Sequence, residues 1–187
     1  MKKKAKTPIL LFLTVSISLF LGSDPQSQPR FQPPILITSA GQSADVQIGG
    51  VLVKRAGLTA TLSKNATQED LEDKKTLILV IGVSMKGLGA AGLDLAEEKK
   101  RVTELIREAQ KKGTALLCLH LGGEARRGEL SDQVIQDFLP DAQMAIVVKS
   151  GNRDGLFTRI CTDRGIPLLE VDRAADVQKP LEDIFSR

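Results

Sequence analysis

One stretch constrains the fold more than any other. Residues 76–83, TLILVIGV, form a nearly continuous apolar run, and the glycine-rich SMKGLGAAG of residues 84–92 follows at once. A strand that is apolar on both faces is buried on both faces, which is the position of a central strand in a parallel sheet. The stretch therefore predicts a central parallel strand, then a glycine-rich loop, then a helix over about 94–112 whose apolar residues form one stripe.

Strands and helices alternate along the rest of the chain. We expect further strands at about 35–38, 58–62, 115–121, 142–148 and 166–171, with helices at about 43–56, 131–139, 156–163 and 176–185. Basic residues and then a glycine precede three of the strands, at Lys54-Arg55-Ala56-Gly57, Lys112-Gly113 and Arg164-Gly165, which is typical of helix C-termini. We expect Ser43 and Ser131 to cap the helices that follow them.

Alternating strands and helices predict the fold class. They indicate βαβ crossovers and a single doubly wound parallel sheet of about six strands, an α/β three-layer sandwich that is flavodoxin-like or Rossmann-like. Right-handed crossovers favour the flavodoxin-like strand order 2-1-3-4-5 with one added strand, and a Rossmann order is the alternative.

The N-terminal segment has the order of a secretory signal. A start with four lysines precedes an apolar run at residues 9–21, then Gly22, Ser23 and a polar, proline-rich stretch. The run is shorter than the roughly 20 residues that cross a bilayer comfortably. We expect a signal segment at 1–23, a Pro/Gln-rich linker at 24–34 and an α/β domain at 35–187. The domain is then extracytoplasmic, in the periplasm or on the cell surface, and membrane-anchored if the signal is uncleaved.

Charge and cysteine content exclude several classes of function. The net charge is +3, and removing the four lysines of residues 1–23 leaves −1, which gives no electrostatic case for nucleic acid. Cys118 and Cys161 fall in an apolar strand and a helix, so we expect buried thiols and no disulfide. The sequence has one histidine and no Cys/His cluster, so we expect no metal site.

A candidate site follows from the expected topology. Ligands of such sheets bind past the carboxyl ends of the strands, where the strand order reverses. Four loops meet there, and their glycine N–H groups, helix N-termini and cations suit a small polar or anionic molecule. The candidate ligand-binding residues are Ser39, Gly41, Gln42, Ser43, Ser84, Lys86, Gly87, His120, Gly122, Gly123, Arg126, Asn152 and Asp154. Arg127 is a further candidate partner for an anion.

Two motifs suggest cofactors but fit them poorly. Gly87-x-Gly89-x-x-Gly92 has the spacing of a dinucleotide fingerprint, yet it follows the third strand and no acidic residue ends the next one. Residues 39–43 resemble the phosphate loop of flavodoxins, yet the chain has no Trp or Tyr to flank a flavin ring. We therefore expect no cofactor.

A catalytic function would have to use His120. As a general base it needs a nucleophile such as Ser39, Ser43 or Ser84 within hydrogen-bond reach. The sequence has no G-x-S-x-G elbow, so His120 is a weak catalytic candidate and we expect binding instead of catalysis.

Three motifs together resemble a known family. ILITSAGQS at 35–43, HLGGEARRGELSD at 120–132 and SGNRDGLFT at 150–158 resemble a bacterial family of exported domains of unknown function. The resemblance implies export and a Rossmann/flavodoxin-like fold, and it implies no activity. We expect an exported domain that binds a small polar or anionic ligand, with a membrane transport protein as a candidate partner. The alternatives are a hydrolase or transferase that uses His120 with a rim serine, and a purely partner-binding domain.

Overall fold

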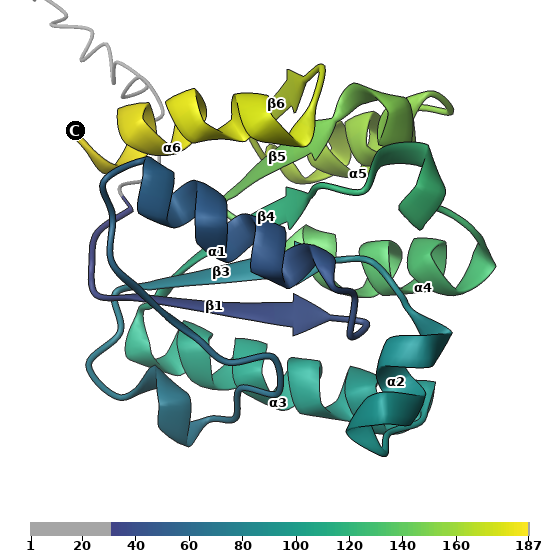
Figure 1. The fold of residues 1–187 in the computed structure, drawn as a ribbon, viewed down its shortest axis with the longest axis horizontal. Coiled ribbons are helices and arrows are strands. Elements are labelled where there is room, and N and C mark those ends of the chain that lie inside the picture. Colours follow the sequence, from purple (N-terminus) through teal and green to yellow (C-terminus); the bar gives the residue numbers. More distant parts are fainter. Residues whose placement is uncertain (1–30, 187) are drawn as a thin grey trace, which may run out of the picture.

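The computed structural model describes residues 31–186, so the predicted signal segment and residues 24–30 of the predicted linker lie outside the described residues. Six parallel strands form one sheet in the order β2-β1-β3-β4-β5-β6 (Figure 1). They are β1 (Ile35–Ala40), β2 (Ala60–Leu62), β3 (Thr76–Ile81), β4 (Ala115–His120), β5 (Met144–Val148) and β6 (Leu168–Val171). The predicted flavodoxin-like order with one added strand is confirmed.

Helices cover both faces of the sheet. They are α1 (Asp45–Arg55), α2 (Met85–Ala91), α3 (Leu95–Lys112), α4 (Glu129–Phe138), α5 (Leu156–Arg164) and α6 (Gln178–Phe185). Short 3-10 turns are η1 (Glu69–Leu71), η2 (Gly123–Arg126), η3 (Leu139–Asp141), η4 (Lys149–Asn152) and η5 (Ala174–Val177). Apolar residues of α1 and α6 pack on one face, and those of α3, α4 and α5 pack on the other. The fold is the predicted three-layer sandwich.

Strand β3 is the centre of the core. All six of its residues are buried, and it pairs with β1 on one side and β4 on the other. Its side chains alternate between the two apolar clusters: Leu77 and Leu79 face α3, while Ile78 and Val80 face α1. Strand β2, in contrast, has three residues and pairs only with β1, so it forms one edge of the sheet.

The helix ends follow the glycine signals. Gly113 and Gly165 adopt left-handed backbone conformations at the ends of α3 and α5, each with φ of +66°, and Gly57 follows α1 with φ of +74°. At the other end of α3, Asp94 and Glu97 form a capping box.

The glycine-rich stretch after β3 is a helix and not the predicted loop. The Ser84 Oγ accepts a hydrogen bond from the Gly87 N–H (3.1 Å) and caps α2, and Gly92 ends it with φ of +69°. Two glycines lower the intrinsic helix propensity, but the cap and tertiary packing compensate. Gly87 lies against the Gln42 carbonyl, where a side chain would overlap that oxygen.

Ser43 makes the predicted cap hydrogen bond at the start of α1, whereas the predicted Ser131 cap is wrong. The N-cap position of α1 is Ala44, and the Ser43 hydroxyl one residue earlier accepts a hydrogen bond from the Asp45 N–H (3.1 Å). Ser131 lies inside the first turn of α4, where its hydroxyl accepts from the Val83 N–H over 3.0 Å. Ser131 thus joins α4 to the segment that follows β3.

The packed domain begins earlier than composition suggests. Phe31, within the proline-rich stretch assigned to the linker, is fully buried, and its ring centroid lies 6.0 Å from that of Phe185. The Cys118 and Cys161 thiols are free and buried, as predicted. Within residues 31–186, no helix combines the length and apolar character needed to cross a membrane.

Candidate functional site

The four predicted loops meet at one edge of the sheet, because all six strands are parallel. Gln42 forms an isolated bridge with Val83, and the Ser84 N–H donates to the Gly41 carbonyl over 2.8 Å. Turns η2 and η4, after β4 and β5, contact each other. We call this region the rim and define it as residues 39–43, 82–87, 120–127 and 149–154.

An internal carboxylate occupies the rim between β1 and β3. Glu98 of α3 is fully buried, and it accepts hydrogen bonds from the Gly41 N–H (2.8 Å) and the Gln42 amide (3.0 Å). The Arg101 guanidinium bonds both Glu98 oxygens and also the Ser39 carbonyl (2.7 Å). Burial opposes ionisation, but the bonds and charge of Arg101 with the Gly41 and Gln42 bonds hold the pKa of Glu98 below its usual value. The groups predicted to bind an outside anion therefore already bind one of the chain's own.

Arg126 also has an internal partner. Its Nε lies 3.0 Å from the Asp45 carboxylate at the start of α1. The side chain crosses the backbone at Gly82 and Gly122, and a side chain at Gly122 would overlap it. Gly122 is thus needed for the close approach of Arg126, whose Nε bonds Asp45 while the side chain stays 32% exposed.

The loop after β5 is held by a second ionic cluster. Arg127 pairs with Asp132 (2.6 Å) and Asp154 (2.8 Å), and it donates to the Gly151 carbonyl. The hydrogen bonds that Arg127 donates to Asp154 and Asp132 raise the pKa of Arg127, and those to Asp154 lower the pKa of that carboxyl. Asn152 accepts from the Phe157 N–H over 2.9 Å and so orders the start of α5.

His120 is committed to the backbone. It is buried, with Nδ1 3.0 Å from the Ile81 carbonyl oxygen and Nε2 3.0 Å from that of Gly123. Its ring centroid lies 5.0 Å from that of Phe157. Burial lowers the pKa of His120, and the two backbone hydrogen bonds only partly oppose this. Both ring nitrogens face carbonyl oxygens, so the neutral ring donates to only one of them and neither nitrogen is directed at a hydroxyl nucleophile.

The three rim serines are not paired with His120 either. Ser43 and Ser84 accept the backbone hydrogen bonds described above. The Ser39 side chain is fully buried, and its Oγ has no hydrogen-bond partner among residues 31–186. Lys86 is exposed on the first turn of α2. Within the described residues, no group of three or more His, Cys, Asp or Glu side chains is placed to hold a metal ion.

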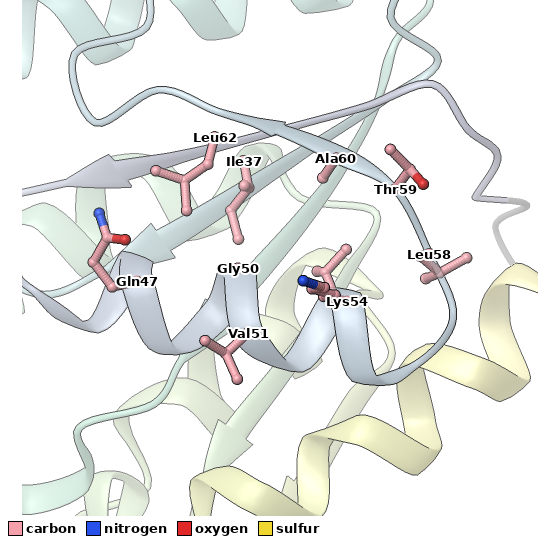
Figure 2. A pocket seen from close by; sticks show the side chains of 10 residues that line it. Ile37, Gln47, Gly50, Val51, Lys54, Leu58, Thr59, Ala60 and Leu62 are labelled. Carbon is pink, nitrogen blue, oxygen red and sulfur yellow. The ribbon is translucent and has the colours of Figure 1, made fainter.

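A cavity of about 380 Å³ lies elsewhere, between α1 and the edge strand β2 (Figure 2). We call it the α1–β2 cleft. Its lining consists of Ile37, Gln47, Gly50, Val51, Val53, Lys54, Leu58, Thr59, Ala60 and Leu62, and includes none of the predicted site residues. Helix α1 comes closest to β2 at Gly50, where a Cβ would lie 2.5 Å from Leu62 Cδ1. Sequence reasoning missed the cleft, because apolar residues around an edge strand look the same whether or not a gap separates them.

Comparison with solved structures finds distant similarities. A GDSL-like lipase from Bacteroides thetaiotaomicron is 10% identical over 77% of this chain and 71% of that chain, with a TM-score of 0.35. The psychrotrophic esterase EstA from Pseudoalteromonas sp. is 9% identical over 82% and 95%, with a TM-score of 0.32. These scores are too low to transfer an activity.

Comparison with families is more direct. No curated protein matches the sequence. The family described as a domain of unknown function, DUF6305, matches residues 32–185, which is most of the chain and nearly all of the folded part. The resemblance seen in the three sequence motifs is thereby confirmed at the level of an uncharacterised family with a parallel α/β fold: this chain belongs to the DUF6305 family.

Proposed function

We propose that this chain is an exported, non-catalytic binding domain and that its ligand site is the α1–β2 cleft. The ligand is a small molecule with an apolar body. Export is supported by the order of residues 1–23, in which a basic start precedes an apolar run and then small residues. This proposal keeps the predicted class of function and moves the site away from the rim.

The shape and lining of the cleft support a ligand site. Small-molecule sites are concave, have volumes of about 300–1,000 Å³ and are mainly apolar with a few polar groups. The cleft has a volume of about 380 Å³, and six of its ten lining residues carry aliphatic side chains. Val51 and Leu62 beside it are large apolar residues that remain exposed at 51% and 37%. Burial of such surface by a ligand is favourable.

The observation that carries the proposal is the contrast in hydrogen bonding. At the rim, Glu98, Arg126, Arg127 and His120 all bond to other groups of the chain. A ligand there has to break those bonds before it makes its own. At the cleft, a ligand displaces only water from apolar surface. The hydrolase or transferase alternative has the further difficulty that both nitrogens of His120 face backbone carbonyl oxygens instead of a serine hydroxyl.

Two single-tryptophan variants test where ligands bind, because the natural chain contains no tryptophan. Val51→Trp places an indole at the cleft, and Met85→Trp places one at an exposed position of the rim. We expect small amphiphiles to change the emission of Val51→Trp saturably and to leave that of Met85→Trp unchanged. They should also raise the melting temperature of the unaltered full chain. A response only in Met85→Trp returns the site to the rim and contradicts the proposal.

A further inference from the structure

We infer that the α1–β2 cleft selects a small monocarboxylic acid: one anionic head on an apolar body. This inference rests on the proposed function and adds the charge, the size and the orientation of the ligand. It is argued from the residues that line the cleft.

The charge of the ligand follows from Lys54. It is the only charged residue in the lining, which contains no Asp or Glu. Lys54 forms no ion pair with any residue of 31–186. A lysine lays its methylene stem along apolar surface and keeps its ammonium at the polar boundary. A cationic ligand would meet this ammonium without compensation, whereas a single carboxylate neutralises it.

The orientation follows from the spacing of the polar residues on α1. Gln47 and Lys54 are two helical turns apart, so they lie on the same face with about 10 Å between them along the axis. Gly50 lies between them, opposite Leu62 and Ile37 (Figure 2). The Leu62 side chain fills the space over Gly50, so a carboxylate at Lys54 places its apolar body on the side of the cleft formed by Leu58 and Ala60.

The volume sets the size. Because a water molecule accounts for about 30 Å³ of liquid, a cavity of about 380 Å³ holds about a dozen non-hydrogen atoms. Octanoate and acids of similar size fit this limit.

A second copy of the chain fits the cleft less well. In a twofold dimer the same patch faces itself, so the Lys54 side chains of both copies would be brought together. Like charges across such an interface are unfavourable, whereas they attract an acid.

The test compares octanoate, 1-octanol and octylammonium on the full chain by calorimetric titration. We expect octanoate to bind about two- to fivefold more tightly than octanol, which is the range of an exposed ion pair, and octylammonium to bind most weakly. Lys54→Met should abolish the preference for octanoate without weakening octanol, and Lys54→Arg should retain it. Lys86→Met, which removes an exposed lysine at the rim, is the matched control and should change nothing.

Failure of this inference differs from failure of the proposed function. Equal binding of octanoate and octanol to the cleft overturns the acid preference and leaves the apolar site in place. If Lys86→Met loses the preference for octanoate, the carboxylate binds at the rim and the inference about the cleft is overturned. A concentration-dependent dimer that octanoate does not dissociate assigns the cleft to a second copy and also overturns it. No binding of any of the three compounds contradicts the proposed function itself.

Discussion

The rim and the α1–β2 cleft differ in how their polar groups are used. The rim is rich in hydrogen-bonding and charged residues, and contacts within the chain engage most of them: Glu98 with Arg101, Asp45 with Arg126, and Arg127 with two aspartates. The cleft has few polar groups, and its one cation forms no ion pair within residues 31–186. The comparison teaches that a sequence motif dense in polar residues can form a hydrogen-bond network within the chain. A binding site for a ligand instead requires groups that have no partner within the chain.

Of the variants considered, removal of the Glu98 carboxylate should lower the free energy of unfolding most. Glu98→Ala leaves Arg101 and two rim donors without their acceptor, so we expect the free energy of unfolding to fall by about 3–5 kcal/mol. Urea denaturation measures this loss. Glu108→Ala is the control on the same helix, because Glu108 forms only exposed pairs with Lys111 and Lys112 and should cost no more than about 1 kcal/mol. Equal losses in the two variants would show that the rim network is not a stabilising unit.

Substitutions in α2, which packs against the rim, should change the stability less than loss of Glu98. Two glycines of this helix serve as test and control. Gly87→Ala forces a methyl group against the Gln42 carbonyl, so we expect a loss of about 1–3 kcal/mol. Gly89→Ala, two residues along the same helix, meets no atom within 4 Å and should gain about 0.5–1 kcal/mol from higher helix propensity. Thermal unfolding of both variants checks the difference in sign. A gain in both would mean that α2 does not press on the rim.

The rim should also respond to pH through His120, the only histidine of the chain. Burial lowers its pKa in the folded state, so below about pH 6.5 the unfolded chain takes up the proton first. Stability should therefore decrease as the pH falls from about 7 toward 5.5, the range below an ordinary histidine pKa. His120→Gln should flatten this part of the profile. An unchanged slope would mean that His120 is protonated equally in both states.

The smallest effect is expected at the cleft. Val51→Ser removes an exposed apolar side chain that packs against little of the chain, so we expect a change in stability within about 0.5 kcal/mol. Its affinity for an apolar ligand should fall clearly, because the ligand loses that contact. Denaturation and titration of the same preparation separate the two quantities. A large loss of stability would mean that the cleft belongs to the core and is not open to a ligand.

The fold could be predicted well because its signals are local. The apolar run of β3, the glycines after three helices and the alternation of elements each depend on neighbouring residues. Crossover handedness then reduces the possible strand orders to a few, and the choice between the flavodoxin-like and Rossmann orders needed coordinates. The prediction of a loop at 84–92 was wrong because glycine content was given more weight than the Ser84 cap and the contact with Gln42.

The partners within the rim could not be predicted. Glu98 and Arg101 are three residues apart on α3, as are Glu108 and Lys111, and the sequence gives no sign that only the first pair is buried. The contact of Arg126 with Asp45 joins residues 81 positions apart. The predicted ligand residues therefore share one edge, as the topology requires, while their bonding depends on side-chain packing that only coordinates reveal.

The Glu98 carboxylate has a consequence for any solute that reaches this corner of the protein. Tethered to the same polypeptide as Gly41 and Gln42, it acts as a resident competitor whose effective concentration is of the order of millimolar or higher. A free phosphate or carboxylate must compete with the Glu98 carboxylate, which cannot dissociate from the chain. A flavodoxin-like fold whose rim is occupied by its own carboxylate can evolve a binding site elsewhere, such as between a helix and an edge strand, while the rim stays occupied.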